Sequence, residues 1–238
     1  MKLGTAEILD KAEEEKRRRN GLLSGSNSTN GGGGGGGGGG DGPDGEPPDL
    51  RQRFNSEKLR VLTFFLLLAI MMTFGGLIAA YLVIATNGVA EWQPFNLPIQ
   101  VWISTFLILA SSVTYHFGQS AVERNITPVA KRWLVATTVL GAAFVSSQIL
   151  AWVALAERGL YMSGNPYAGF FYILTAVHAI HVVGGISALG SVLLRSWNPT
   201  DEPRMIERRA SIASVVGWYW HFMGGLWVVL FILLGFWK

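Results

Sequence analysis

The chain contains no cysteine, which removes a whole group of protein chemistries from consideration. Disulfide bonds, thiolate zinc sites, iron–sulfur clusters and a cysteine nucleophile are all excluded. Charged residues are also scarce: they make up 15% of the 238 residues, against about a quarter in a soluble domain, whereas hydrophobic residues make up 50%. This composition indicates a membrane protein rather than one or two soluble domains.

The first fifty residues differ in composition from the rest of the chain. They combine a charged segment with ten consecutive glycines at 31–40 and contain few apolar side chains. Such a segment cannot bury enough apolar surface to offset the entropy of ordering, so we expect residues 1–50 to form a disordered low-complexity tail. The tail has no apolar core of a signal peptide, so we expect the N-terminus to be retained. Residues 51–238 are expected to form one membrane domain.

Five apolar stretches without any Asp, Glu, Lys or Arg divide the membrane domain. They cover residues 61–86, 97–117, 133–156, 168–194 and 212–237. Each exceeds the roughly 20 residues that a helix needs to cross a hydrocarbon core of about 30 Å. Helices are the expected spanning elements, because lipid offers backbone groups no alternative hydrogen-bond partner. The sequence therefore predicts an all-α, polytopic bundle of five transmembrane helices.

The Lys and Arg residues beside the spans predict the orientation of the chain. The segment before the first span, the second loop and the fourth loop hold four, three and four of them. The first loop has none, the third has only Arg158, and the C-terminus has only Lys238. Because positive residues are retained on the cytoplasmic side, we expect the N-terminus in the cytoplasm and the C-terminus outside. The connections are short, so we also expect consecutive helices to pack as antiparallel neighbours.

Four histidines, His116, His178, His181 and His221, stand out among the side chains inside the spans. His178 and His181 are three residues apart, so they share a helix face with Gly185. One interpretation makes them metal or haem ligands. We favour the other, in which they are hydrogen-bonded to neighbouring helices, because no intramembrane carboxylate is present to orient a ligating imidazole. On straight helices His181 and His221 differ in depth by about 6 Å, which does not suit a shared haem.

Aromatic and polar side chains at helical spacing predict further packing surfaces. The fifth span carries the run Trp218-Tyr219-Trp220-His221-Phe222, followed by Trp227. This run starts six residues inside the span, so it fits a packing surface better than an anchor in the headgroup layer. Gln148 and Trp152 share a face of the third helix and are expected to form interhelical hydrogen bonds. No Ser/His/Asp arrangement, carboxylate pair or phosphate loop occurs, so hydrolysis and phosphoryl transfer by this chain are not expected.

Two motifs together resemble a known family. They are Phe170-Phe171-Tyr172-Ile173-Leu174-Thr175 with His178, His181-Val182 and Gly185, and Trp218-Tyr219-Trp220-His221-Phe222 with Trp227. The segment 61–238 that contains them is similar to subunit III of the haem–copper oxidases, in the five-helix form that lacks the first two helices of the longer form. Gln148 and the end of the second span, with Ser111-Ser112-Val113-Thr114 and His116, are also similar to that family.

This resemblance implies an accessory subunit that holds neither haem nor copper and packs against oxidase subunit I, and subunit II, in a bacterial inner (plasma) membrane. The haem and copper would lie in these partner subunits, bound phospholipid is a further expectation, and no nucleic acid is involved. The complex would reduce O2 to water with electrons from cytochrome c or quinol and would pump protons. No catalytic, metal-binding or cofactor-binding residue is then expected in this chain.

The resemblance instead implies a set of packing or lipid-cleft residues, which we call the signature residues. They are Gln148, Trp152, His178, His181, Gly185, Trp218, Tyr219, Trp220, His221 and Trp227.

The chain departs from the family pattern at three positions inside the spans. Family members usually have a Glu in the first of these spans, a Glu three residues after the Gln of the third, and an Asp two residues after the His-Phe pair of the fifth. The matching positions here hold Ile70, Ala151 and Gly224. A role that depends on intramembrane acids, including a proton-linked one, is therefore not implied for this chain, whereas helix packing and assembly are.

Three other functions share parts of this pattern. A quinol-oxidising di-haem cytochrome b membrane anchor would use its histidines as axial ligands, and it requires two His–His pairs on facing helices at matched depth. A nitric oxide reductase accessory subunit belongs to the same family, and the sequence does not separate it from an oxidase subunit. A small transporter would show inverted repeats or broken helices, and the sequence has neither.

Overall fold

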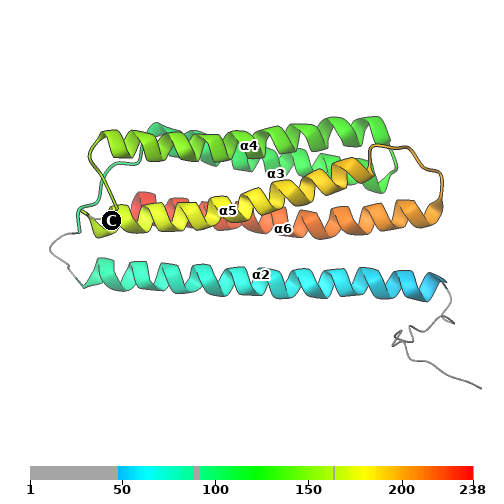
Figure 1. Cartoon of the computed structure of the whole chain (residues 1–238), viewed down its shortest axis with the longest axis horizontal. Coiled ribbons are helices and arrows are strands. Elements are labelled where there is room, and N and C mark those ends of the chain that lie inside the picture. The colour runs from blue at the N-terminus through cyan, green and yellow to red at the C-terminus, as the bar shows by residue number, and fades with distance from the viewer. Residues whose placement is uncertain (1–47, 88–91, 163, 238) are drawn as a thin grey trace, which may run out of the picture. The chain divides into compact units, whose positions relative to one another are not determined.

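The computed structural model of the chain describes residues 48–87, 92–162 and 164–237, with side chains from Glu57 onward. It consists of five helices, α2 (Pro48–Thr86), α3 (Ile99–Glu123), α4 (Thr127–Glu157), α5 (Pro166–Arg195) and α6 (Pro203–Phe236) (Figure 1). All five are long and apolar enough to cross a membrane. The predicted all-α bundle with five transmembrane helices is therefore confirmed. The tail predicted for residues 1–50 lies outside the described residues, except for its last three, which belong to α2.

Three of the helices begin several residues before the apolar stretch that predicted them. α2 starts thirteen residues before Val61, α4 six residues before Trp133, and α6 nine residues before Ile212. These extensions contain nine of the eleven Lys and Arg residues that predict the cytoplasmic side; the other two, Arg124 and Arg195, lie at the ends of α3 and α5. The apolar stretch therefore marks the part of each helix that crosses the hydrocarbon core. The charged turns before it extend the helix into the headgroup layer.

Proline marks the beginning of the last three helices. It occupies a first-turn position in α4, α5 and α6, where a missing backbone N–H costs no intrahelical hydrogen bond. In α5 the Asn165 side chain also caps the helix by accepting a hydrogen bond from the Tyr167 N–H at 3.0 Å. These residues explain why the helices start where they do.

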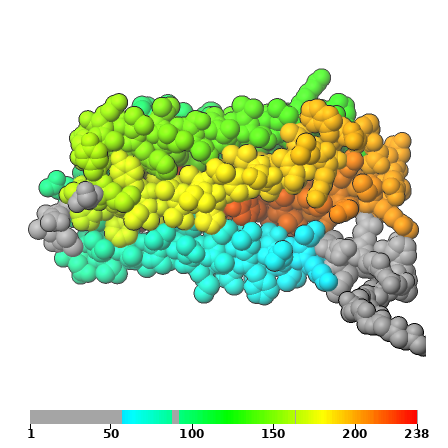
Figure 2. Space-filling view, viewed as in Figure 1, coloured from blue at the N-terminus to red at the C-terminus, as the bar shows by residue number. Residues whose placement is uncertain are grey.

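Helices α3 to α6 form a closed ring, since α3 contacts α4 and α6, and α5 contacts α4 and α6. Helix α2 packs on the outside of the ring against α6 and α5 (Figures 1 and 2). The predicted antiparallel packing of consecutive helices is confirmed from α3 to α6. It is wrong for α2 and α3, which do not contact each other within the described ranges. Their connection, residues 87–98, has twelve residues and can reach about 40 Å, so it does not force neighbouring positions.

The core of the bundle contains residues from all five helices, and aromatic rings are its largest members. Trp220, Trp227, Tyr115 and Phe144 are among its largest fully buried side chains. Many large apolar side chains instead face outward, for example Phe106 with 72% of its surface exposed. Exposed apolar surface on this scale suits a lipid environment, where it needs no cover.

Candidate functional site

The signature residue His178 lies at the centre of an aromatic cluster that we call the histidine core. Its ring centroid is 5.1 Å from that of Trp227, 5.7 Å from Phe144 and 6.2 Å from Phe74. These side chains come from α6, α4 and α2, so four helices meet around the imidazole on α5. All four residues are buried. The histidine core therefore connects the outer helix α2 to the ring of α3 to α6.

The expectation that His178 is hydrogen-bonded to a neighbouring helix is wrong. Both of its ring nitrogens are buried and have no hydrogen-bond partner among the residues that the structure describes. The physical reason lies in its neighbours, since Phe74 and Phe144 offer no polar atom. The single indole N–H of Trp227 is directed to Thr105 Oγ1 at 3.0 Å instead. Sequence spacing identified the helix face of His178 but not the aromatic character of what packs on it.

The other histidines have different surroundings. His181 Nδ1 lies 2.7 Å from the backbone oxygen of Val177, so its ring is bonded within its own helix rather than to a neighbouring one. His221 is exposed on α6, with its ring centroid 5.9 Å from that of Tyr115. His116 is exposed on α3. The histidines are thus distributed over the inside and the outside of the bundle.

This distribution does not provide the two histidine pairs that a di-haem cytochrome b requires. His178 and His181 lie on the same helix, and the rings packed on His178 are those of Phe74, Phe144 and Trp227. Within the described part of the chain, His, Cys, Asp and Glu side chains form no group of three or more that could hold a metal ion.

Hydrogen bonds from Gln148 and Trp152 connect α4 to two different helices. Gln148 Nε2 donates to Ser104 Oγ on α3 at 2.5 Å, and Trp152 Nε1 donates to Thr175 Oγ1 on α5 at 3.0 Å. Both acceptor hydroxyls donate in turn to a backbone oxygen of their own helix. A hydroxyl has one donor and two acceptor sites, so each of these hydroxyls accepts a hydrogen bond from α4 and donates one to its own helix. The two side chains share a helix face, as expected, but they do not share a partner.

The two buried tryptophans of α6 form the same kind of hydrogen bond to α3. Trp220 Nε1 donates to Ser111 Oγ at 3.2 Å, and Trp227 Nε1 donates to Thr105 Oγ1 at 3.0 Å. Ser111 and Thr105 again donate to backbone oxygens of α3. The indole rings therefore fill the core, and their N–H groups are satisfied by the neighbouring helix.

Tyrosine hydroxyls add a second set of links, in which the acceptor is backbone. Tyr115 on α3 donates to the Ala213 oxygen on α6 at 2.6 Å, and Tyr219 on α6 donates to the His181 oxygen on α5 at 2.8 Å. Two more join their helices to the end of α6: Tyr81 donates to the Trp237 oxygen at 2.7 Å, and Tyr167 donates to the Leu234 oxygen.

Gly185 allows α5 and α6 to approach closely. A Cβ atom at this position would lie 3.0 Å from ring atoms of both Tyr219 and Trp220. The aromatic run around these two residues is distributed over several faces of α6, since Trp220 is 1% exposed, Tyr219 is half-buried and Trp218 is 53% exposed. Only part of the run is therefore a packing surface within this chain.

The positions at which the resemblance expects acids lie inside the bundle. Ile70 and Ala151 are buried, at 3% and 0% exposure. Gly224 is also buried, and a Cβ there would lie 2.9 Å from Ser112 Oγ. Ile70 and Ala151 fill their positions with apolar side chains, and at Gly224 the neighbouring Ser112 leaves little room for any side chain.

The hydroxyl acceptors are the functional residues that the sequence analysis did not identify. They are Ser104 and Thr105, whereas Ser111 and Thr175 entered only as parts of family motifs. A signal was present, because Ser104 and Ser111 are seven residues apart in an apolar span and thus lie on one helix face. Each is buried and accepts a hydrogen bond from another helix.

Comparison with known proteins gives consistent matches over most of the chain. A family model described as Cytochrome c oxidase subunit III matches residues 55–238. The chain is 35% identical over 172 residues to Cytochrome c oxidase subunit 3 of Corynebacterium diphtheriae, which covers 70% of this chain and 82% of that protein. It is 34% identical over 170 residues to Probable cytochrome c oxidase subunit 3 of Nocardia farcinica, covering 70% and 81%. It is 31% identical over 193 residues to Cytochrome c oxidase subunit 3 of Thermostichus vulcanus, covering 79% and 88%.

Proposed function

Since the chain belongs to the cytochrome c oxidase subunit III family, we propose that it is an accessory subunit of a respiratory haem–copper oxidase, which supports the assembly and stability of the catalytic subunit. It packs against subunits I and II, which hold the haem and copper, in the plasma membrane. The complex reduces O2 to water and pumps protons. The names of the curated relatives favour cytochrome c over quinol as electron donor, and an oxidase over a nitric oxide reductase.

The observation that carries this proposal is the use of the signature side chains as links between helices. Gln148, Trp152, Trp220 and Trp227 each donate a hydrogen bond to a hydroxyl on another helix. Tyr219 donates to the backbone of α5. Such links hold the helices in one arrangement, and a bundle with one arrangement can present a constant surface to a partner.

The exposed part of the aromatic run supports a protein partner on α6. Trp218 and His221 are three residues apart, and both are exposed. Gly225, four residues after His221, is exposed on the same side, and a Cβ atom there would meet no other atom within 4 Å. An imidazole at membrane depth is costly against acyl chains, whereas a partner helix can satisfy it and can approach closely at a glycine. We call Trp218, His221 and Gly225 the α6 surface.

A pull-down from native membranes in mild detergent tests the proposal, with mass spectrometry of the recovered proteins and an absorption spectrum. The expected result is recovery of a large haem–copper oxidase catalytic subunit. Recovery of a nitric oxide reductase catalytic subunit would assign the chain to that complex instead. Recovery of the chain alone, carrying its own b-type haem, would overturn the proposal and move the function to the histidines.

A further inference from the structure

A seam between α3 and α6 on the outside of the bundle carries polar side chains. Two glycines of α6 let the two helices approach closely there. A Cβ atom at Gly217 would lie 2.5 Å from Gln119 Oε1, and one at Gly224 would lie 2.9 Å from Ser112 Oγ. The two glycines are seven residues apart, as are Gln119 and Ser112, so these contacts fix the register of the antiparallel helices.

Two histidines lie on this seam, and we call them the seam histidines. His116 is between Ser112 and Gln119 in α3, and His221 is between the two glycines in α6, so the register places them at about the same depth. The ring of Tyr115, the residue before His116, has its centroid 5.9 Å from that of His221. Both histidines are exposed, and neither imidazole forms a hydrogen bond within the described part of the chain.

The seam histidines lie too deep to reach the headgroup layer. His116 is seven residues from Glu123, the first charged residue that follows it in α3, and His221 is twelve residues from Arg209, the last that precedes it in α6. At about 1.5 Å per residue these separations are roughly 10 and 18 Å along the helices. Lys and Arg bridge part of such a distance with their long stems, but a histidine side chain is too short.

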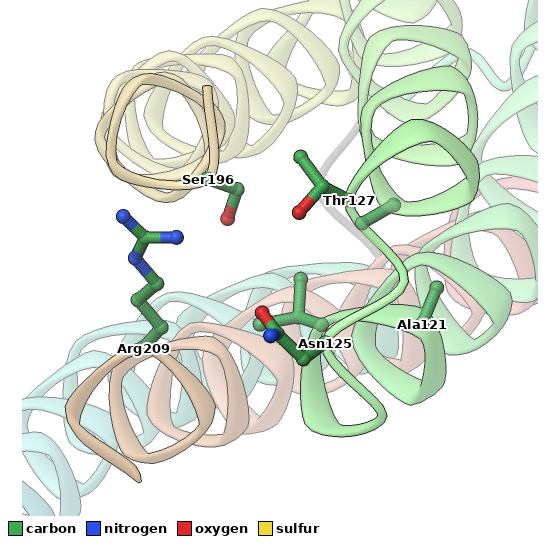
Figure 3. A pocket seen from close by; sticks show the side chains of 7 residues that line it. Ala121, Asn125, Thr127, Ser196 and Arg209 are labelled. Atoms are coloured by element: carbon green, nitrogen blue, oxygen red, sulfur yellow. The ribbon is translucent and has the colours of Figure 1, made fainter. Parts of the chain in front are cut away.

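The charged residues at the end of the seam have partners of their own. Glu123 accepts a hydrogen bond from Gln119 Nε2 at 2.9 Å. Arg209 donates to the Asn198 oxygen at 2.8 Å, and Figure 3 shows that its guanidinium points toward Ser196 at the end of α5. The seam histidines therefore have no charged partner in these two side chains.

Acyl chains on the seam would leave both imidazoles unsatisfied. A neutral imidazole has one hydrogen-bond donor and one acceptor, and a polar group without a partner is costly in hydrocarbon. Exposed imidazoles at this depth therefore indicate a protein neighbour rather than lipid. Gly225, on the same exposed side of α6, gives a second indication. A Cβ atom there would meet no other atom within 4 Å, so its bare backbone leaves room for another helix.

We propose that one transmembrane helix of the haem–copper catalytic subunit covers this seam, with a hydroxyl, amide or carboxylic acid side chain opposite the seam histidines and a close approach at Gly225. Such a group donates a hydrogen bond to one imidazole and accepts one from the other. The identity of the partner rests on the proposed function. The inference goes beyond that function because it adds His116 of α3 to the α6 surface and requires a polar residue in the partner helix.

Recovery of the catalytic subunit with the affinity-purified full chain, from native membranes in mild detergent, tests the polar contact. His116→Phe keeps an aromatic ring but removes both nitrogens, whereas His116→Gln keeps a hydrogen-bond donor and an acceptor. We expect His116→Phe to lower recovery at least about fivefold and His116→Gln to stay within about twofold of the wild type. Val113→Ala, at a position of α3 that is 57% exposed, is the control and should recover the partner like the wild type.

A matched pair of glycine variants tests the close approach. Gly225→Leu on α6 and Gly76→Leu on α2 each place a bulky side chain at an exposed position where a Cβ atom meets nothing within 4 Å. We expect Gly225→Leu to lower recovery at least about tenfold, because it blocks the partner helix, and Gly76→Leu to leave recovery unchanged. SDS unfolding of the isolated chains should show neither variant to be less stable than the wild type, since Leu favours helix more than Gly does.

Photo-crosslinking identifies the segment that covers the seam. The chain has no cysteine, so Val229→Cys, one turn beyond Gly225 and 50% exposed in the wild type, takes a single benzophenone maleimide. Mass spectrometry should find it crosslinked to a transmembrane peptide of the catalytic subunit that contains a polar residue. A crosslink to lipid alone, or to a second copy of this chain, would overturn the inference.

These measurements separate failure of the inference from failure of the proposed function. A wild-type chain that recovers no haem–copper catalytic subunit would contradict the proposed function. If the wild type recovers that subunit and His116→Phe and Gly225→Leu recover it equally well, the inference about the seam is overturned and the proposed function stands.

Discussion

The indole nitrogen of Trp220 lies 3.2 Å from the hydroxyl oxygen of Ser111, and this hydrogen bond joins α6 to α3 inside the bundle. Both residues are buried, so neither water nor headgroups can replace the interaction. The same indole ring packs on two glycines, since Cβ atoms at Gly141 and Gly185 would lie 2.9 and 3.0 Å from it. Trp220 therefore combines a polar link to α3 with close packing on α4 and α5.

Ser111→Ala should destabilise the bundle by about 0.5–2 kcal/mol, because it leaves the buried Trp220 N–H without an acceptor. Reversible unfolding in mixed micelles with increasing SDS measures the change. Ser146→Ala is the control, since this exposed hydroxyl bonds only within its own helix. A loss no larger than that of the control would show that the indole hydrogen bond does not stabilise the fold.

Gly185→Ala should destabilise the bundle by about 1–3 kcal/mol. The added methyl group would lie 3.0 Å from the rings of Tyr219 and Trp220, and the Trp220 ring is held by its hydrogen bond to Ser111. The neighbouring Gly184→Ala should be neutral or slightly stabilising, because the nearest atom there is the Tyr219 hydroxyl oxygen at 3.8 Å. Thermal unfolding of both variants in detergent gives the comparison. Similar midpoints would mean that α5 and α6 can move apart without cost.

The spans could be predicted because hydropathy reports directly on the hydrocarbon core. Stretches without charge, such as 168–194, correspond closely to a transmembrane helix, here almost the whole of α5. Contacts between consecutive helices could be predicted only where the connection between them is short. The three-residue connection 124–126 makes α3 and α4 neighbours, but α2 and α3, which are twelve residues apart along the chain, do not contact each other within the described ranges. The length of that connection permits several positions for α3, and the packing of Phe74 on His178 and His181 is a tertiary contact that no local pattern contains.

The candidate site was less predictable than the fold. Helical spacing correctly placed Gln148 and Trp152 on one face, yet it could not say that one bonds to α3 and the other to α5. The run from Trp218 to Phe222 was expected to form one packing surface, although His221 is exposed and Trp220 is 1% exposed. Adjacent residues on a helix point about 100° apart, so a continuous motif necessarily spans inside and outside.

His178→Leu should leave the stability unchanged or raise it. Both imidazole nitrogens are buried and lack a partner in the described part of the chain, and the surrounding rings are apolar, so an apolar side chain of similar size removes unsatisfied polar atoms. SDS unfolding measures the effect. Phe144→Ala, which leaves a cavity in the same core, is the positive control. Its free energy of unfolding should fall by about 3–5 kcal/mol, which shows that the assay detects packing defects there. A loss above about 2 kcal/mol for His178→Leu would reveal a polar partner of this histidine.

His221→Ala should weaken the complex but not the chain itself. The side chain belongs to the exposed α6 surface, so its truncation removes contacts with a partner and few within the bundle. We expect recovery of the catalytic subunit in detergent to fall at least about fivefold, while unfolding of the isolated chain and its haem content stay the same. Ile180→Ala, an exposed position on α5, is the control. Unchanged recovery would remove His221 from the partner surface, and loss of a haem spectrum would identify it as a ligand.

The orientation of the chain can be tested cleanly because it has no cysteine, so a single introduced thiol is the only site for a maleimide label. Asp201→Cys lies in the α5–α6 connection and Tyr161→Cys in the α4–α5 connection, and both positions are exposed. The distribution of Lys and Arg predicts that a membrane-impermeant maleimide labels Tyr161→Cys in intact cells and Asp201→Cys only in inside-out vesicles. The reverse pattern would invert the topology.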